Sequence, residues 1–351
     1  MIAAPNNRGA NAQHILCMPK YCGFNDVLCQ IWVSHQYAQA SERKLWIDTR
    51  CSGLADTLAY YMQPQNVTGQ SHINLRTEIS NGEFGQLNYL NCYPNIPSGC
   101  LDQLGHYFIS NAPSLRIKRS KFLGILSQIK YLFKPSIEQP HFRLCAFLQL
   151  RIYLKTHKVD FIGRNFKNES IVVHASVGGG LESLQTLALF RLNKCIRDQI
   201  SERLKVLPED YDAIHIRHTD YRTNYQVFIQ GICAKLAGRT VLVCSDNPEA
   251  IDFAKKNLSH SKVITIATSD ELSTDPVKSR PAHYHWHLPL DLRRQRNIAM
   301  LADLVGLSKS TRLFYTAVKN GEFVGQSGFS QLADGLRKTP SLLANWLGCD
   351  N

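Results

Sequence analysis

The segments that mark an exported or membrane-spanning chain are absent from this sequence. No apolar run approaches the roughly 18 residues that a membrane-spanning helix needs. The first residues, MIAAPNNRGANAQ, have neither the charged start nor the apolar run of a secretory signal peptide. We therefore expect a cytoplasmic protein.

Paired cysteine spacings are also missing. The eleven cysteines include no CxxC pair and show no spacing typical of a metal site. An odd, scattered set in apolar surroundings, such as Cys145, Cys233 and Cys244, indicates reduced thiols that serve as small hydrophobic side chains. This pattern again favours the cytoplasm, and it predicts no metal site.

Low-complexity tracts do not occur, and hydrophobic residues make up 44% of the chain, so we expect a globular fold. A chain of 351 residues is too long to fold around a single simple hydrophobic core, and its length suits two domains. We expect these domains at 1–205 and 206–351.

Negative charge is scarce, since the formal net charge is +12. Such a balance implies an anionic partner, which can be nucleic acid, an acidic membrane surface or a phosphorylated small molecule. Basic runs lie at 116–122 and 293–296, although such runs often form only a solvated face. Because no recognised nucleic-acid-binding module is present, we do not expect a nucleic-acid partner. Peripheral membrane contact through 116–134 is a further expectation.

Strand patterns alternate with helical patterns in both halves of the chain. The first half reads as a strand at 15–18, a glycine loop, a helix ending near 40 and a strand at 44–48. The second half alternates in the same way, with strands at 213–217, 240–246 and 262–267. This order predicts an α/β fold built from two βαβ, Rossmann-like domains with parallel sheets.

A polar cluster follows the buried strand of the segment YDAIHIRHTDYRT at 211–223. His215, Arg217 and Asp220 stand at or beyond the carboxyl end of this strand. Open α/β sheets bind ligands at that end. An Arg next to a buried strand needs an anionic partner, which is either a bound anion or a nearby carboxylate.

Two loops have the composition of anion-binding loops. Gly23 and Asn25 precede or open the first helix, and the segment with Ser327, Phe329 and Ser330 leads into the last part of the chain. Backbone N–H groups at a helix N-terminus bind anions, although each loop can equally be a turn with an ordinary helix cap.

Together, two βα domains with loops facing a crevice suit a nucleotide-sugar transferase. Arg217 is suited to the diphosphate, because a planar guanidinium binds two oxygens at once. The Ser327–Ser330 loop would bind other oxygens. No DxD-like metal motif occurs, so we expect stabilisation of the leaving diphosphate without a metal ion.

Four segments resemble a known family in the same order along the chain. HIRHTDY is similar to the H-x-R-x-x-D signature of the superfamily of α1,2-, α1,6- and protein O-fucosyltransferases. The segments CGFNDVLCQIWVSHQYAQASERKLWID, LVCSDNPEAIDFA and AMLADLVGLSKSTRLF with GQSGFSQLA resemble its glycine loop, its strand ending in Ser-Asp and its terminal Asp helix with phosphate loop. The nearest resemblance is to the rhizobial nodulation α1,6-fucosyltransferase type.

The resemblance implies a GT-B fold with two domains facing across a cleft. We expect the donor on the C-terminal domain and the acceptor on the N-terminal one, whose middle region is irregular and basic. It implies inverting transfer of L-fucose from GDP-fucose to a glycan hydroxyl, with no cofactor. It assigns His215 to guanosine, Arg217 to the diphosphate, Asp303 to the guanine edge, and Asp220 to the acceptor hydroxyl. Ser327, Phe329 and Ser330 would bind phosphates, and Gly23 and Asn25 would lie at the cleft.

The chain departs from the family pattern at His218, where a second Arg often stands, so from the resemblance we expect a second arginine clamp on the phosphates to be missing. Three other hypotheses stay open. They are a transferase with another nucleotide-sugar donor, a basic nucleic-acid-binding protein, and a degenerate transferase that binds glycan without turnover.

Overall fold

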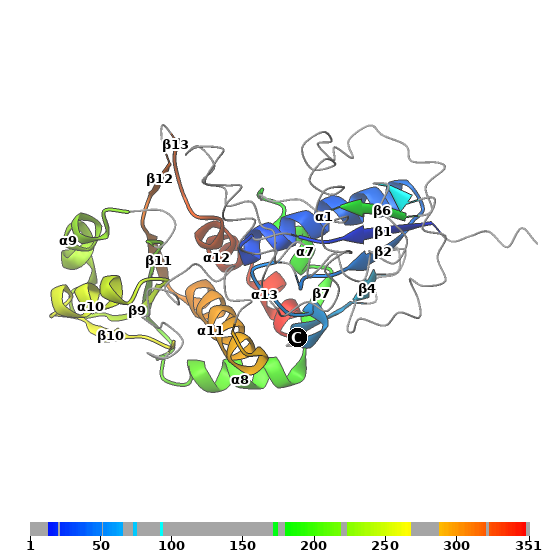
Figure 1. Ribbon diagram of the computed structural model, residues 1–351. Helices are drawn as coiled ribbons and strands as arrows, with labels where there is room; N and C mark the ends of the chain where they lie inside the picture. Colours follow the sequence, from blue (N-terminus) through cyan, green and yellow to red (C-terminus); the bar gives the residue numbers. More distant parts are fainter. Residues whose placement is uncertain are drawn as a thin grey trace, which may run out of the picture.

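The computed structural model describes residues 13–19, 22–50, 52–65, 73–75, 92–93, 171–174, 180–218, 223–267, 288–320 and 323–348. Within these ranges the chain forms two parallel sheets with helices around them (Figure 1). The predicted α/β class with two βαβ units is therefore confirmed.

The first sheet has the strand order β4-β2-β1-β6-β5, and every neighbouring pair is parallel. Its strands are β1 (His14–Cys17), β2 (Lys44–Ile47), β4 (Ile73–Leu75), β5 (Cys92–Tyr93) and β6 (Ile171–His174). Helix α1 (Phe24–Ala40) links β1 to β2, and its apolar residues, Val27, Leu28 and Ile31, are buried. The helical spacing of these apolar residues in the sequence therefore corresponds to the buried face of α1.

The second sheet has the order β10-β9-β8-β11 and is also parallel throughout. Its strands are β8 (Asp212–Ile216), β9 (Thr240–Ser245), β10 (Lys262–Ile264) and β11 (Arg312–Tyr315). The last predicted strand, 262–267, ends three residues early, at Ile264, and Arg217 lies just beyond β8 rather than within it.

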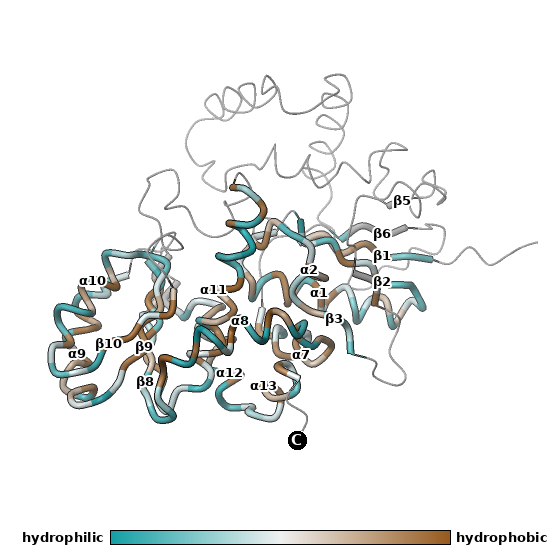
Figure 2. The backbone as a smooth tube through the Cα atoms, turned by 90° about the horizontal axis from the view of Figure 1, so that it is seen from below, coloured by the Kyte–Doolittle hydropathy of each residue, from teal (hydrophilic) through white to brown (hydrophobic). Residues whose placement is uncertain are grey.

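Helices cover both faces of the second sheet. Ile214 and Ile216 of β8 pack with α9 (Tyr225–Leu236) and α10 (Pro248–Asn257). Ala213 and Leu242 belong to the core that contains α11 (Leu290–Lys309). Figure 2 shows brown strands in this sheet, with teal residues on α9 and α10 beside it. A strand covered on both faces has to be apolar on both sides, as the run Ala213–Ile214 is.

The chain crosses between the two sheets twice. Helix α8 (Lys194–Leu204) leads from the first unit into β8, and α12 (Gly328–Lys338) and α13 (Pro340–Leu347) return after β11. Helix α12 packs against α11, α1 and α7 (Ser183–Leu187). Helix α13 packs on β7 (Phe190–Leu192), which pairs with β3 (Met62–Pro64), and Trp346 is fully buried there. The boundary expected between 205 and 206 stays a prediction.

A short hairpin, β12 (Val318–Asn320) and β13 (Phe323–Gly325), connects β11 to α12. A short helix, α2 (Leu58–Tyr61), precedes β3. None of the helices in the described ranges combines the length and the hydropathy that crossing a bilayer requires.

A buried carboxylate holds the amino end of β8. Asp212 accepts hydrogen bonds from Arg312 (Nε to Oδ1, 2.9 Å; Nη2 to Oδ2, 2.6 Å) and from Arg239 (Nε to Oδ2, 3.0 Å). Burial alone would raise the pKa of Asp212, but the hydrogen bonds from the two guanidinium groups hold it below its ordinary value. The cluster ties β8 to the neighbouring strand β11 and to the turn before β9.

Replacing this carboxylate should cost stability in a pH-dependent way. We expect Asp212→Asn to lower the free energy of unfolding by about 2 kcal/mol at pH 7, because charge-assisted hydrogen bonds are lost. A carboxyl whose folded-state pKa is lowered stabilises the fold above its unfolded pKa of about 4, and this contribution disappears as the pH falls through the folded value. The difference between variant and wild type should therefore shrink below about pH 4.

Urea unfolding at pH 7 and at acidic pH measures this difference. Asp198→Asn is the matched control, because Asp198 makes an exposed ion pair with Lys194 on α8. Its effect should stay within about 0.5 kcal/mol. An equally small loss for Asp212→Asn would show that the buried cluster contributes nothing to folding.

Candidate functional site

Three strand ends of the second sheet are joined by hydrogen bonds at their carboxyl side. The Arg217 backbone N–H donates to Thr316 Oγ1 after β11, at 3.2 Å. Ser245 Oγ at the end of β9 donates to the Ile216 carbonyl of β8, at 2.9 Å. The polar residues that follow these strands are thereby fixed relative to one another, at the edge where parallel sheets bind ligands.

Arg217 forms an ion pair with Asp246, which directly follows β9. The distance from Nη1 to Oδ2 is 2.9 Å, and the two side chains are 22% and 19% exposed. Asp246 Oδ1 accepts a second hydrogen bond, from the His218 backbone N–H at 2.8 Å. The sequence allowed either a bound anion or a nearby carboxylate as the partner of Arg217, and in the structure the partner is the Asp246 carboxylate. The pair lies at the molecular surface, within reach of solvent.

His215 is hydrogen-bonded to the start of α12. Its Nδ1 lies 2.7 Å from Ser330 Oγ, and Ser330 Oγ lies 2.8 Å from Ser327 Oγ. Ser327 caps α12, because its Oγ accepts from the Ser330 N–H at 3.1 Å. The Phe329 ring packs against the His215 ring, with centroids 5.1 Å apart. Four of the predicted residues therefore lie together.

The His215 ring is neutral. Its pKa is lowered to about 4, mainly by burial; the Asp246 carboxylate opposes this shift and the Arg217 guanidinium adds to it. A neutral imidazole can donate a hydrogen bond to a serine hydroxyl or accept one from it, and it adds no positive charge next to Arg217.

Asn25, on α1 of the first unit, lies against the start of α12. A Cβ built on Gly328 would lie 2.6 Å from Asn25 Nδ2 and 3.0 Å from its Cγ, so the two residues are in close contact. Asn25 Nδ2 also donates to the Gly180 carbonyl at 3.3 Å. Asn25 is buried and joins α1, the segment after β6 and α12.

Gly23 precedes α1 with a backbone φ of −66°, and a Cβ added there would meet no atom within 4 Å. Nothing in the described residues therefore requires glycine at this position. The open space on this side of α1 is what a ligand would need, and the predicted role of Gly23 stays a prediction.

Asp303 lies on α11, behind β9. Burial raises the pKa of the Cys244 thiol well above its ordinary value, and the Asp303 carboxylate next to the thiol raises it further. Cys244 is the β9 residue that pairs with His215 across the sheet. Asp303 is thus one strand away from His215, on the α11 side of the sheet. Asp220 lies outside the described residues.

Asp246 and Thr316 belong to this cluster, although the sequence assigned them no role. Each directly follows a strand of the second sheet. The rule that parallel strands end at one edge could have identified both once the strand order was known.

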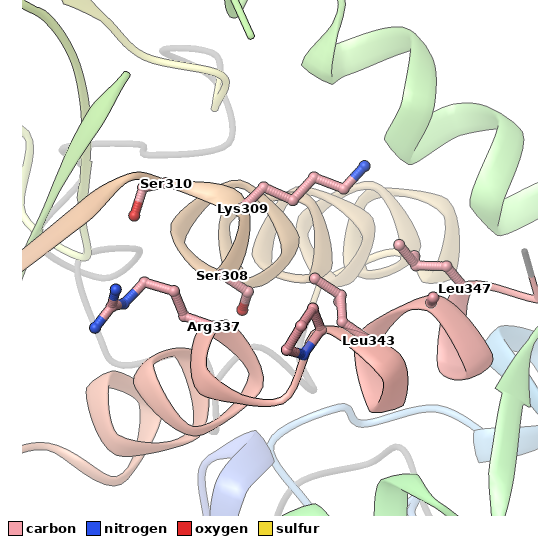
Figure 3. Close-up of a pocket in the computed structure, with 8 residues that line it drawn as sticks. Ser308, Lys309, Ser310, Arg337, Leu343 and Leu347 are labelled. Atoms are coloured by element: carbon pink, nitrogen blue, oxygen red, sulfur yellow. The ribbon is translucent and has the colours of Figure 1, made fainter. Parts of the chain in front are cut away.

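No three His, Cys, Asp or Glu side chains gather as a metal site in the part of the chain that the structure describes. A cavity of about 430 Å³ lies elsewhere, where α11, α12 and α13 meet (Figure 3). The hydroxyls of Ser308 and Ser310 in its wall donate to helix carbonyls, and Arg337 pairs with Asp334. The Ser308 and Ser310 hydroxyls and the Arg337 guanidinium thus already have partners within the chain.

Solved structures of similar shape were found for most of the chain. Fucosyltransferase NodZ from Bradyrhizobium is 14% identical with a TM-score of 0.49, and the match covers 92% of each chain. NodZ alpha-1,6-fucosyltransferase soaked with GDP-fucose is 15% identical, with a TM-score of 0.49 over 92% of this chain and 91% of that one. POFUT1 in complex with GDP-fucose is 11% identical, with a TM-score of 0.46 over 93% and 94%.

No protein-family model and no curated protein matches the sequence. NodZ is of the type that the sequence motifs resemble. Identities and TM-scores at this level assign no role to any residue of this chain, and the site stands on its own contacts.

The contact between Gly328 and Asn25 can be tested by adding one methyl group. Gly328→Ala should lower the free energy of unfolding by about 1–3 kcal/mol, because the whole Asn25 side chain has to move. Thermal and urea unfolding measure the loss. Gly231→Ala in α9 is the control, since a Cβ there meets nothing within 4 Å. It should be neutral or stabilising by up to about 1 kcal/mol.

A double-mutant cycle with Asn25→Ala separates this clash from general loss of structure. The cost of Gly328→Ala should fall in the Asn25→Ala background, because the obstructing side chain is gone. An unchanged cost in that background would refute the close contact.

Proposed function

We propose that this chain is a glycosyltransferase that moves L-fucose from GDP-fucose to a hydroxyl of a glycan acceptor, with inversion and without a metal ion. The observation that carries the proposal is the convergence of His215, Arg217, the Ser327–Ser330 loop and Asn25 at the carboxyl end of a parallel sheet. Groups from both units meet there, as a donor bound between two domains requires. The choice of GDP-fucose rests on the sequence motifs.

The start of α12 suits the diphosphate of the donor. The N–H groups of Gly328 and Phe329, the first two residues of α12, have no carbonyl partner among the described residues. The positive end of the helix dipole and free N–H groups together attract an anion. The hydrogen bond between His215 and Ser330 and the cap by Ser327 fix these donors in place.

Arg217 is proposed to bind the diphosphate beside this helix start. When the acceptor hydroxyl attacks the anomeric carbon from the opposite face, negative charge builds on the departing GDP. Donors that are already held in place stabilise that charge without reorganisation. Asp220 is proposed to orient the acceptor hydroxyl or take its proton. Contacts of His215 with guanosine and of Asp303 with the guanine edge stay predictions.

The acceptor side and the cellular setting are parts of the same proposal. We place the acceptor on the N-terminal unit and the protein in the cytoplasm, with peripheral contact between the basic segment 116–134 and the inner face of a membrane. That segment lies outside the described residues. Binding to vesicles with and without anionic lipid tests the contact, and equal binding to both would end it.

Nucleotide binding tests the donor. GDP in large excess over its Kd should raise the melting temperature by a few degrees, because a ligand that binds only the folded state stabilises it. ADP and UDP at the same concentration should shift it less, and EDTA should not change the effect. A shift by UDP or ADP that exceeds the shift by GDP would indicate another donor. Salt-sensitive binding of RNA or DNA without any nucleotide effect would favour a nucleic-acid-binding protein.

Arg217→Lys tests the bidentate contact with the diphosphate. We expect release of GDP from GDP-fucose to fall about 100-fold, because a point charge cannot replace the planar fork. Arg337→Lys is the control, since Arg337 pairs with Asp334 at the far cavity, and it should keep full activity. Retained activity in Arg217→Lys would show that this residue serves only its pair with Asp246. Turnover that no acceptor elicits, with GDP still bound, would identify a degenerate transferase.

A further inference from the structure

His218 follows Arg217 at the end of β8, and its ring is held on two sides. Nδ1 accepts a hydrogen bond from the Thr223 backbone N–H at 3.2 Å. The ring stands edge-on to Tyr225, with centroids 4.7 Å apart, and Tyr225 stands edge-on to Phe253. The position of the imidazole is therefore fixed by packing and by one hydrogen bond.

The bond to Thr223 also decides which nitrogen carries the proton. A backbone amide only donates, so Nδ1 has to be the acceptor in this bond, and the ring hydrogen is on Nε2. The Thr223 hydroxyl is occupied separately, because it donates to the Arg217 carbonyl at 2.8 Å. His218 thus presents Nε2–H as a fixed donor.

This donor has no partner within the described part of the chain. Among the described residues, the His218 ring makes its contacts through Nδ1 and the ring edge, and none of them involves Nε2. The side chain is partly exposed, so Nε2 can reach solvent or a ligand.

Asp246 holds His218 and Arg217 together. One carboxylate oxygen binds the Arg217 guanidinium at 2.9 Å, and the other accepts the His218 backbone N–H at 2.8 Å. Two side chains with N–H donors are therefore fixed side by side at the strand end where the proposed diphosphate binds.

We propose that His218 is a second diphosphate-binding residue, which donates a hydrogen bond from Nε2 to a phosphate oxygen next to Arg217. This inference rests on the proposed function. A diphosphate offers more oxygens than one guanidinium can bind, and the Nε2–H of His218 supplies a further donor beside Arg217.

Two amide substitutions of His218 test the roles of its two ring nitrogens separately. The amide oxygen of His218→Asn lies near the place of Nδ1 and can accept from Thr223, but nothing replaces Nε2. The amide nitrogen of His218→Gln reaches the place of Nε2, whereas the bond to Thr223 is lost. Each variant therefore keeps one of the two functions of the ring.

We expect opposite orders for nucleotide affinity and for stability. By calorimetry, His218→Asn should bind GDP about tenfold more weakly than wild type, and His218→Gln within about threefold of it. Without nucleotide, His218→Gln should have the lower melting temperature of the two. Guanosine should bind wild type and His218→Asn equally, because it carries no phosphate.

The outcomes distinguish this inference from the function on which it rests. Wild type that binds no GDP would refute the proposed function. Wild type and His218→Asn that bind GDP equally, while His218→Gln loses both stability and affinity, would show that the ring only holds Thr223. A loss of guanosine affinity equal to that of GDP in His218→Asn would place the ring at the nucleoside and overturn the diphosphate contact.

Discussion

The hydrogen bond between His215 and Ser330 is the contact on which the proposed site depends. It is buried, and it connects the carboxyl end of a strand in the second sheet to the first turn of a helix that returns to the first unit. A polar pair that is removed from water loses more free energy when one partner is removed than an exposed pair does. This pair therefore keeps the start of α12 at the end of β8.

A single carboxylate organises the charged side of the site. Asp246 binds the Arg217 side chain and the His218 backbone, so the two residues after β8 are oriented before any ligand arrives. The His215 ring, whose pKa is lowered to about 4, adds no second positive charge near Arg217. The arrangement suits an anion that has to be bound and then released with additional negative charge, since its donors need little reorganisation.

The local pattern of the sequence predicted the two sheets and the edge at which the site lies. Alternating strand and helix periodicities predicted both parallel sheets, and the polar residues after the pivotal strand marked the edge where ligands bind. The Ser327–Ser330 segment indicated a helix cap, and the structure has this cap at Ser327, with the helix beginning at Gly328. The strand at 262–267 was predicted too long, because short apolar runs do not define their own ends.

The sequence by itself determined the elements, since periodicity, caps and turns depend on neighbouring residues. Only the tertiary structure decided that Asp246 is the partner of Arg217, that Asn25 leaves no room for a side chain at residue 328, and that α13 packs on the first unit. These contacts join residues far apart in the chain, and no local pattern encodes which of many carboxylates or asparagines will be adjacent. The packing of two sheets around α12 selects them, because each buried polar group has to find its partner there.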